Sequence, residues 1–496
     1  MNRQDVKRQK QTKKNEDSET TREFSLLNPY FLGTILLGIG LYTATKFRGD
    51  REGHILKYLE AKENAYIPHN HHIAIGFGAC QDLLVDFDKF FKALDLGPPK
   101  LGDESHFRSI RGDEELNKMF AYFFLAGAAA ERFVRNIDYY KRIVDAAKTV
   151  EGAHLTLGGN APVMATRFIK EGATVLLGAK MSTNLRNLLP GSLQVSGDVL
   201  NEDDIHLILE YKEGSKWGPF KAPRANRFIM HSDGNNPQIS SLESFVDDVK
   251  LLNPNLLVIG GLHMMDNVPL NKTFREQRLL KVQELIRSQK KTTYVHFEMA
   301  SYVDESLMRQ LNGLIFPYVD SMGMNEQELP NLISILRTGK VNVVSDSNPR
   351  VATVLDEMRE LYILMSQLKA EDMRDLTRIH VHTLAYQAIL VIRGSKWTNS
   401  EAAAAKASLI AHKWVCADDK VDLAKSRLIL DESFATTRAT GSKRIYLNSG
   451  VACWDEDMFH FCVAPNLVCT DAVQTAGAGD NISAAALVPQ IPVPTP

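Results

Sequence analysis

Short apolar runs alternate with longer amphipathic stretches over most of the chain. The runs are continuous rather than alternating, which is typical of strands buried on both faces, and therefore of a mainly parallel sheet. Helical periodicity lies between them, for example at 274–289 and 349–368. This pattern predicts an α/β fold with a central sheet sandwiched by helices. The predicted strands are 72–78, 173–178, 256–261, 293–298 and 341–345.

Two stretches depart from this pattern. Residues 86–150 are mostly helical in periodicity, and residues 187–232 contain the alternating segment 204–211. Alternation of that kind is typical of a strand with one buried face. We interpret the two stretches as a smaller α+β lid inserted into the α/β domain.

The N-terminus has a different character. Residues 1–23 are polar and densely charged, which predicts disorder, whereas residues 24–45 carry no charge. The apolar run predicts a signal peptide or an uncleaved signal anchor, with a buried core helix as the alternative. We therefore expect residues 1–51 to precede the main domain of residues 52–496, and the protein to enter the endoplasmic reticulum or secretory pathway. Basic residues on both sides of the run leave its orientation undecided.

Composition narrows the classes of partner. Hydrophobic residues make up 44% and charged residues 24% of the chain, which is ordinary for a globular protein. The net charge of -2 and the absence of a basic patch interleaved with aromatic residues argue against nucleic acid as a partner. No feature indicates an obligate assembly, so we expect a monomer whose membrane association, if any, uses the N-terminal run.

Five cysteines are present, at positions 80, 416, 453, 462 and 469. None forms a Cys-x-x-Cys pair, which argues against a structural zinc site. In an oxidising lumen one or two disulfides form and one cysteine is left over. Buried thiols are the alternative, and the spacing does not fix the pairing.

Polar residues cluster where the predicted strands end. In open α/β sheets ligands bind beyond the carboxyl ends of the strands, so these residues are candidates for a binding site. Each one alone is equally well explained as a solvated loop residue. The candidates are Asp82, Gly158 to Asn160, His263, Asp266, His296, Glu298, Asn325 and Glu328.

The strongest local signal is the turn Gly477-Ala478-Gly479-Asp480, which leads into an alanine-rich segment. Glycines allow close approach of the backbone to a ligand, and a helix start leaves amide groups free to bind an anion. Asp480 would then accept a proton from an attacking hydroxyl, although a plain N-cap aspartate has the same local sequence. Neither a P-loop nor the protein-kinase signatures occur.

This turn resembles the catalytic turn of the ribokinase-like superfamily, and further motifs resemble the ADP-dependent glucokinases, with the animal, membrane-associated branch as the best match. The resemblance runs in one order from about residue 52 to the C-terminus. The segments that carry it are 76–82, 158–161, His296-Phe297-Glu298, Asn325 to Glu328, 378–383 and the turn itself.

The resemblance implies a reaction and a set of roles. ADP would donate its β-phosphoryl group to the 6-hydroxyl of D-glucose, with Asp480 as base and the amides of the Gly477–Gly479 turn neutralising charge. One Mg²⁺ would be held by Glu298 and Glu328, partly through water, with Asp480 close by. Asn325, His382 and Val468 would lie on the nucleotide side.

On the sugar side the resemblance implies Asp82, Glu131, Gly158, Gly159 and Asn160, with His231 or His263 as further candidates. A carboxylate at Glu131 would repel a phosphorylated sugar, which favours a glucokinase over a phosphofructokinase. An ADP-dependent phosphofructokinase and a catalytically inactive, membrane-anchored binding protein remain alternatives. Gly78 and Cys80 depart from the polar residues expected in the microbial relatives, which leaves contacts there undefined.

Two cysteines fall in segments that the resemblance places on the nucleotide side. On that basis we hypothesise that Cys416 and Cys469 form a disulfide beside the nucleotide site.

Overall fold

The computed structural model describes residues 51–493 except 267, 343–345, 347, 369–370 and 448–449. The predicted apolar run at 24–45 lies outside these residues. The chain divides into the units Met1–His54 and Ile55–Pro496, and the description below concerns the second. None of the described helices combines the length and the apolar character needed to cross a membrane.

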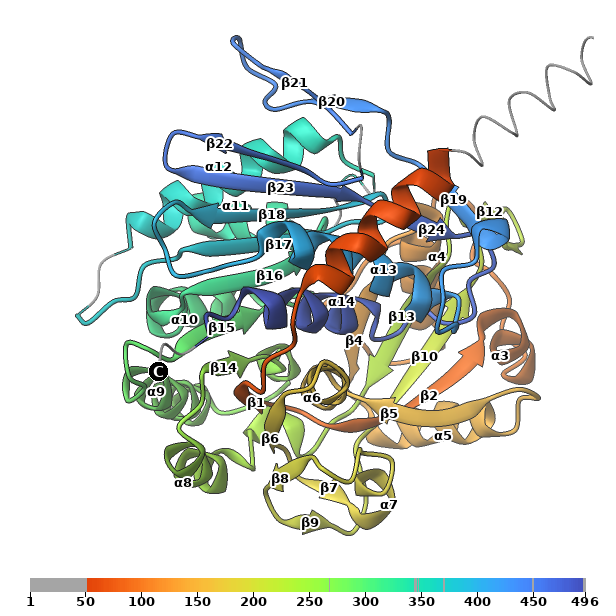
Figure 1. The fold of residues 1–496 in the computed structure, drawn as a ribbon. Coiled ribbons are helices and arrows are strands. Elements are labelled where there is room, and N and C mark those ends of the chain that lie inside the picture. The colour runs from red at the N-terminus through yellow and green to blue at the C-terminus, as the bar shows by residue number, and fades with distance from the viewer. Residues whose placement is uncertain are drawn as a thin grey trace, which may run out of the picture. The chain divides into compact units, whose positions relative to one another are not determined.

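A ten-stranded sheet forms the centre of the larger domain (Figure 1). Its order is β22-β23-β18-β17-β16-β15-β14-β1-β6-β8, and from β17 to β8 all neighbouring strands are parallel. The parallel strands are β1 (His72–Gly76), β6 (Thr174–Gly178), β8 (Gln194–Ser196), β14 (Leu256–Ile259), β15 (Tyr294–Glu298), β16 (Ser321–Asn325) and β17 (Arg378–His382). Three antiparallel strands complete the edge: β18 (Tyr386–Ile392), β23 (Phe459–Pro465) and β22 (Ala452–Glu456).

The prediction of a mainly parallel α/β sheet is therefore confirmed. The first four predicted strands correspond to β1, β6, β14 and β15. Of the fifth, residues 343–345 lie outside the described residues, and residues 341–342 are not in a strand. The strand next to β15 is instead β16, whose sequence Ser-Met-Gly-Met-Asn has none of the β-branched residues that mark strands.

Helices cover both faces of the sheet because its strands present apolar side chains on both sides. In β1, Ala74 packs into one core cluster, whereas Ile73 and Ile75 pack into another. One face is covered by α8 (Leu242–Leu252), α9 (Lys272–Arg287), α10 (Glu305–Leu314), α11 (Glu328–Thr338) and α12 (Val351–Ser366). The other is covered by α6 (Asn160–Lys170), α7 (Thr183–Arg186), α13 (Ser400–Val415), α14 (Ala478–Leu487) and the helical residues 55–65.

A second sheet of six strands, with the order β3-β4-β13-β10-β2-β5, forms the smaller domain, which we call the lid. Its helices enclose an aromatic core in which the Phe91 and Trp217 rings stack at 4.4 Å. The strands are β2 (Cys80–Asp86), β3 (Ser109–Ile110), β4 (Ala130–Val134), β5 (His154–Gly158), β10 (Ile205–Tyr211) and β13 (Asn226–His231). The helices are α3 (Phe87–Ala93), α4 (Asp113–Ala126) and α5 (Ile137–Lys148).

The extent of the lid differs from the predicted segments 86–150 and 187–232. The strands β2 and β5 also belong to the lid sheet, while β8, inside the second segment, pairs with the large sheet. The chain passes from β1 to β2 with only three residues between them, so the polarity pattern contains no break at that boundary.

Short elements join these layers. They are the strand pairs β7 (Met181–Ser182) with β9 (Val199–Leu200), β11 (Lys216–Trp217) with β12 (Phe220–Lys221), β19 (Ser426–Leu428) with β24 (Leu467–Cys469), and β20 (Ser433–Ala435) with β21 (Arg444–Tyr446). The 3₁₀ turns are η1 (Asn236–Gln238), η2 (Leu262–Met265), η3 (Phe316–Tyr318), η4 (Leu423–Lys425) and η5 (Val488–Gln490).

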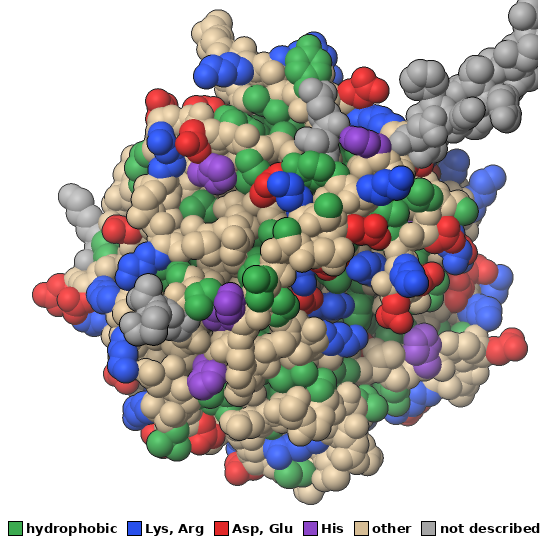
Figure 2. Space-filling view, in the orientation of Figure 1, with side chains coloured by type: hydrophobic (Ala, Val, Ile, Leu, Met, Phe, Trp, Pro, Cys, Tyr) green, Lys and Arg blue, Asp and Glu red, His purple; other side chains and the backbone are tan. Residues whose placement is uncertain are grey.

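On the face drawn in Figure 2, basic and acidic side chains are interspersed.

Gly178 tests the packing of α8 on the sheet. A Cβ atom at this strand end would lie 2.6 Å from the ring of Phe245, a fully buried side chain. We expect Gly178→Ala to lower the free energy of unfolding by about 1–3 kcal/mol, since the ring cannot move without disturbing the core. Chemical denaturation measures this, with Gly191→Ala, at an exposed site with open space, as the control. Equal stability of the two variants would contradict the packing described.

Candidate active site

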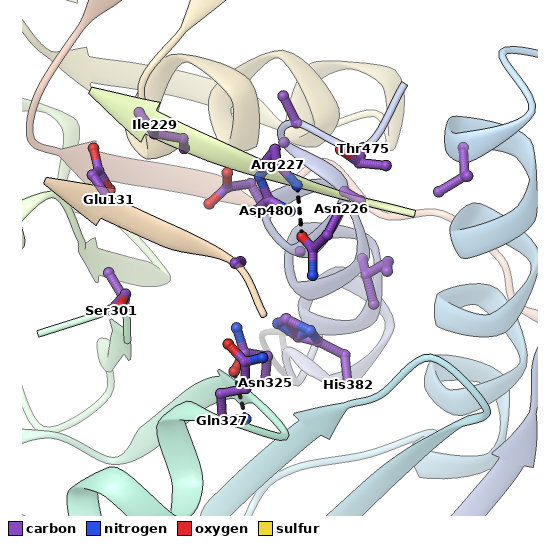
Figure 3. A pocket seen from close by; sticks show the side chains of 18 of the residues that line it. Glu131, Asn226, Arg227, Ile229, Ser301, Asn325, Gln327, His382, Thr475 and Asp480 are labelled. Atoms are coloured by element: carbon purple, nitrogen blue, oxygen red, sulfur yellow. Dashed lines mark hydrogen bonds between the residues drawn. The ribbon is translucent and has the colours of Figure 1, made fainter. Parts of the chain in front are cut away.

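A cavity of about 680 Å³ lies where the carboxyl ends of the parallel strands meet the lid (Figure 3). Most of the predicted site residues line it, although they come from separate segments of the chain. Those lining it are Asp82, Glu131, Gly159, Asn160, His263, Glu298, Asn325, Glu328, His382, Val468 and residues 477–480. Gly158 and His231 are not among the lining residues.

The turn at the start of α14 depends on its two glycines. Gly477 is the N-cap residue and has a φ of 68°, in the left-handed region that favours glycine. At Gly479 a Cβ atom would lie 2.9 Å from the His382 ring. Asp480 is the third residue of the helix, so it is not the N-cap aspartate of the alternative interpretation. The amide of Ala478 donates to the Thr475 carbonyl at 3.4 Å, while the helix start leaves other first-turn amides without partners in the helix.

The Asp480 carboxyl group is buried among other acids. Burial and the nearby Glu298 raise its pKa to about 6, although the Asn160 side chain and the Arg227 charge oppose this. Asn160 Nδ2 donates to Asp480 Oδ1 at 2.7 Å. This bond links the start of α6, after β5, to the turn at 477–480. The second carboxylate oxygen of Asp480, Oδ2, takes no part in it.

Glu298 ends β15 and is held by two hydrogen bonds. Its Oε1 accepts from Ser483 Oγ, and its Oε2 accepts from His296 Nε2, each at 2.8 Å. Burial raises the pKa of Glu298 to about 8, whereas burial and Arg378 lower the pKa of His296 well below its usual value. Because Arg378 donates to Ser321 Oγ, the Ser321 hydroxyl group donates to His296 Nδ1, 2.8 Å away, and the protonated Nε2 of the neutral ring donates to Glu298.

The fully buried Arg378 extends this hydrogen-bond network beyond Ser321. Its Nη1 donates to Ser321 Oγ at 3.1 Å, and its Nε donates to Gln490 Oε1 at 2.6 Å. Of the predicted segment 378–383, only His382 and Thr383 line the cavity, because the cavity lies at the carboxyl end of β17, where these two residues are.

Glu328 is positioned by Asn325, three residues earlier. Asn325 Oδ1 accepts from the amides of Gln327 and Glu328 at 2.8 and 2.9 Å. In return, Glu328 accepts from the Asn325 amide and from its Nδ2, each at 2.9 Å. This reciprocal bonding resembles a capping box and explains the Asn-x-x-Glu spacing. Burial raises the pKa of Glu328 to about 8, and Glu298 and Asp480 contribute to the shift.

At the other end of the cavity, Glu131 lies between two histidines. Glu131 Oε1 is 3.5 Å from His206 Nδ1, and Oε2 is 3.3 Å from His263 Nε2. Burial alone would raise the pKa of Glu131, but the charges of His263 and His206 outweigh it and lower that pKa to about 2. Asp233, 3.0 Å behind His206, overcomes burial and raises the pKa of His206 well above its usual value. Glu131 is therefore an ionised carboxylate.

The Asp82 carboxylate lies so close to Gly158, a residue predicted for the sugar side, that it requires glycine there. A Cβ atom at Gly158 would lie 1.9 Å from Asp82 Oδ1, so only glycine fits beside this carboxylate. Gly158 therefore shapes the site from behind rather than lining it. Burial raises the pKa of Asp82 to about 6, against the opposing His206 charge, and Cys80 Sγ donates to Asp82 Oδ1 at 3.3 Å.

Two other candidates lie behind the cavity wall. The ring of His231 lies 5.1 Å from that of His206, and its Nδ1 is 3.4 Å from Asp233 Oδ1. It therefore supports the histidine that faces Glu131, and it is His263 that reaches the cavity. Asp266 is also absent from the lining and accepts from the Val303 amide at 2.6 Å.

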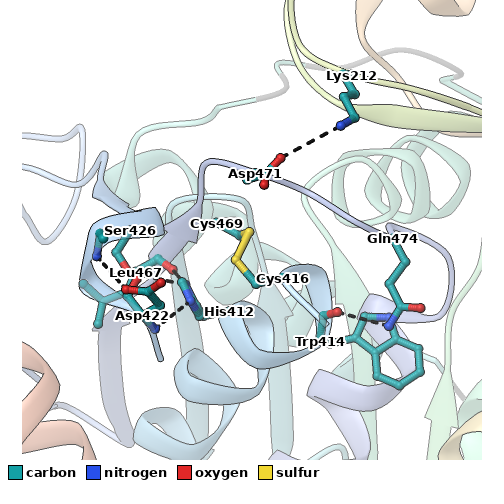
Figure 4. Close-up of a disulfide and its surroundings, with 11 residues drawn as sticks. Lys212, His412, Trp414, Cys416, Asp422, Ser426, Leu467, Cys469, Asp471 and Gln474 are labelled. Carbon is teal, nitrogen blue, oxygen red and sulfur yellow. Dashed lines mark hydrogen bonds and ion pairs between the residues drawn. A yellow bond between two sulfur atoms is a disulfide. The ribbon is translucent and has the colours of Figure 1, made fainter. Parts of the chain in front are cut away.

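A disulfide lies next to Val468, one of the residues predicted for the nucleotide side, and Figure 4 shows it with its surroundings. Cys416 and Cys469 are joined, with Cα atoms 5.7 Å apart, which confirms the hypothesised pairing. Val468 precedes Cys469 in β24, so the disulfide fixes this strand to the end of α13. A second disulfide joins Cys453 to Cys462, and Cys80 is a buried free thiol.

Arg227 is the main site residue that the sequence analysis missed. It belongs to β13 of the lid and lines the cavity. Its charge opposes the rise in the pKa of Asp480, and together with burial it lowers the pKa of His382. Its buried Nε has no hydrogen-bond partner among the described residues. Figure 3 shows Arg227 and Asp480 at the same wall of the cavity. Nothing in the local sequence Asn-Arg-Phe distinguishes this arginine from a surface residue.

Burial of Glu298 makes stability depend on pH. Its pKa is about 8 in the folded protein and 4.5 in the reference state, so unfolding releases a proton and stability falls as pH rises between these values. Without divalent cations at pH 8, we expect Glu298→Gln to raise the Tm by about 2–5 °C and to weaken its pH dependence. Thermal unfolding from pH 5 to 8 measures this, with the exposed Glu284→Gln as control. A pH-independent difference from the wild type would contradict the argument.

The sequence is similar to those of ADP-dependent glucokinases from animals. The chain is 36% identical over 423 residues to an ADP-dependent glucokinase of Bos taurus, covering 84% of this chain and 83% of that protein. It is 28% identical to a probable ADP-dependent glucokinase of Caenorhabditis elegans, covering 84% of each. Both relatives are animal proteins, as the resemblance predicted.

Solved structures share the fold at low identity. An ADP-dependent kinase in complex with fructose-6-phosphate and ADPβS has a TM-score of 0.64 at 16% identity, covering 89% of this chain and 97% of that one. A hypothetical ADP-dependent phosphofructokinase from Pyrococcus horikoshii has a TM-score of 0.57 at 18% identity, covering 85% and 98%. The predicted ribokinase-like fold is therefore confirmed. Residues 71–489 match the conserved region of the ADP-specific phosphofructokinases and glucokinases, and the chain belongs to that family.

Proposed function

We propose that this protein is an ADP-dependent glucokinase, which transfers the β-phosphoryl group of ADP to the 6-hydroxyl of D-glucose to give glucose 6-phosphate and AMP. The observation that carries the proposal is the position of Asp480. Its carboxyl group lies at a glycine-shaped helix start, in one cavity with the ionised Glu131 and the acid pair Glu298 and Glu328. The similarity to the Bos taurus enzyme supports the same reaction.

In the proposed mechanism Asp480 accepts the proton of the sugar hydroxyl as that oxygen attacks phosphorus. Its pKa of about 6 keeps it largely ionised at neutral pH and near the value that suits a general base. The Asn160 bond to Oδ1 orients the carboxylate toward the sugar. First-turn amides of α14 and the Arg227 charge would stabilise the negative charge on the phosphoryl oxygens.

Mg²⁺ suits the carboxylate oxygens of Glu298, Glu328 and Asp480, which line the same cavity. Glu298, Glu328 and Asp480 are buried carboxylates. Beyond the effect of burial, Glu298 raises the pKa values of the other two and Asp480 raises that of Glu328, and a cation would relieve this repulsion. They are not among the described groups whose ligand atoms lie within 4.8 Å of one another. Water would therefore complete the coordination, as Mg²⁺ commonly requires. The ion would supply charge neutralisation to the phosphates when bound.

Glucose is favoured over fructose 6-phosphate by the charge at Glu131. Two histidines keep this carboxylate ionised, so it can accept hydrogen bonds from sugar hydroxyls and would repel a phosphate. A phosphofructokinase is the second candidate because the family includes both activities. Preference for ADP over ATP is supported by the relatives and not by any single residue.

The cellular setting is also a proposal. We infer that the protein is folded in the secretory pathway, where the disulfides Cys416–Cys469 and Cys453–Cys462 can persist. The uncharged run at 24–45 would direct the chain there and could hold it at the membrane as a monomer. Alkylation of thiols before and after reduction, in protein taken from cells, tests the disulfide basis of this proposal.

A coupled assay of the purified protein with Mg²⁺ tests the proposed reaction. We expect AMP and glucose 6-phosphate from ADP with glucose, and at least tenfold lower kcat/KM when ATP replaces ADP or fructose 6-phosphate replaces glucose. Activity with ATP alone would refute the donor. A preference for fructose 6-phosphate would refute the role of Glu131, and no activity with any mixture would favour a binding protein.

Asp480→Asn tests the general base directly. We expect kcat to fall by about a hundredfold or more, with glucose affinity largely retained. In the wild type, the rate should fall as pH decreases through about 6, because protonation removes the base. Turnover across pH 5 to 8, with glucose binding by calorimetry, measures both effects, and the exposed Asp419→Asn is the matched control. Retained turnover in Asp480→Asn would exclude this role.

A further inference from the structure

A carboxylate of the lid contacts the segment that leads into the turn at 477–480. Glu210, near the end of β10, accepts hydrogen bonds at Oε1 from both the amide and the hydroxyl group of Thr475, at 3.0 and 3.1 Å. Thr475 lies two residues before Gly477, and 265 residues separate it from Glu210 in the chain. The contact therefore joins the central strand pair of the lid to the segment that leads into α14.

On its other side the same segment is fixed to the large domain. Trp414 Nε1 donates to the Ala476 carbonyl at 2.8 Å, and Gln474 Nε2 donates to the Trp414 carbonyl at 3.1 Å (Figure 4). The Val473 amide also donates to the Val415 carbonyl at 2.9 Å. Thr475 thus lies between anchors on α13 and the glycine turn, and among the described residues its own amide is held by Glu210 of the lid.

In the part of the chain that the structure describes, little else joins the lid to this segment near Glu210. A cavity of about 170 Å³ lies at the junction, lined by Glu210 and its neighbours on β2 and β10 and by residues 472–475. Apolar packing is therefore incomplete here, and the bonds to Glu210 form a polar link across the gap. Another polar contact between these segments, Lys212 with Asp471, spans 3.9 Å between side chains that are mostly exposed, which makes it weak.

The position of Thr475 bears on the chemistry. Its carbonyl accepts from the Ala478 amide, so a shift of Thr475 changes the path of the backbone through Gly477 to Asp480. Displacements of about 1 Å at a reacting group cost as much as a hundredfold in rate. We propose that Glu210 is a positioning residue, which orders the catalytic turn only when the lid is in the position seen here. This inference rests on the proposed function of the same site.

Such a link gives lid position a direct effect on catalysis. Glu131 of the lid lines the cavity, so glucose bound to it would favour this lid position, and Glu210 would then fix the turn that presents Asp480. With the sugar site empty, the turn would lose the hydrogen bonds to its amide and hydroxyl group. Phosphoryl transfer to water would be limited in the same way, because the base is ordered only after the sugar binds.

The first experiment separates turnover from binding. We expect Glu210→Ala to lower kcat by about 10–100-fold while KM for glucose changes less than about threefold. Glu210→Gln keeps an acceptor oxygen and should retain kcat within about threefold. Thr475→Val, which removes only the hydroxyl bond, should have an intermediate effect that adds little to Glu210→Ala. The exposed lid residue Glu202, changed to Ala, is the matched control.

The second experiment does not need activity. Amide hydrogen exchange of residues 473–480, with and without glucose, should show protection by glucose in the wild type and in Glu210→Gln, but not in Glu210→Ala. An unchanged kcat or unchanged protection in Glu210→Ala would overturn the proposal, as would a Glu210→Gln variant as impaired as Glu210→Ala. A wild type that protects this segment on binding glucose but transfers no phosphoryl group would refute the proposed function and leave the link in place.

Discussion

The structure depends on the burial of several carboxyl groups at one edge of a parallel sheet. Glu298, Glu328 and Asp480 lie at the ends of separate elements, and each is deprived of water while close to like charge. Such an arrangement is unfavourable unless protons or a cation neutralise it. The acids lie in the cavity that the helix start of α14 and the positively charged Arg227 also line.

Each acid is held by a neighbour that fixes its direction. Asn160 holds Asp480, Asn325 holds Glu328, and His296 with Ser483 holds Glu298. The glycines serve the same end by leaving room, as at Gly158 beside Asp82 and at Gly479 beside His382. Directed, desolvated carboxylates are poor for stability and well suited to binding a cation and moving a proton.

The two ends of the cavity use opposite electrostatic solutions. At the large domain, acids are crowded and their pKa values rise, whereas at the lid Glu131 and Asp233 are paired with histidines and their pKa values fall. The first arrangement attracts a cation and the second keeps a fixed negative charge for hydroxyl groups. Because β13 also carries Arg227, the lid contributes both a positive and a negative charge to the cavity.

From the sequence alone we predicted the alternation of strands and helices, the glycine turn at 477–480 and the acids of the two motifs, because these depend on polarity and spacing over a few residues. The Asn325–Glu328 bonds, for example, span three residues. Tertiary structure decided what depends on register between distant strands. It put His206 rather than His231 beside Glu131, brought Arg227 to Asp480, and joined Glu210 to Thr475. Such pairs leave no local signal, since either partner alone would be equally stable at a solvated surface.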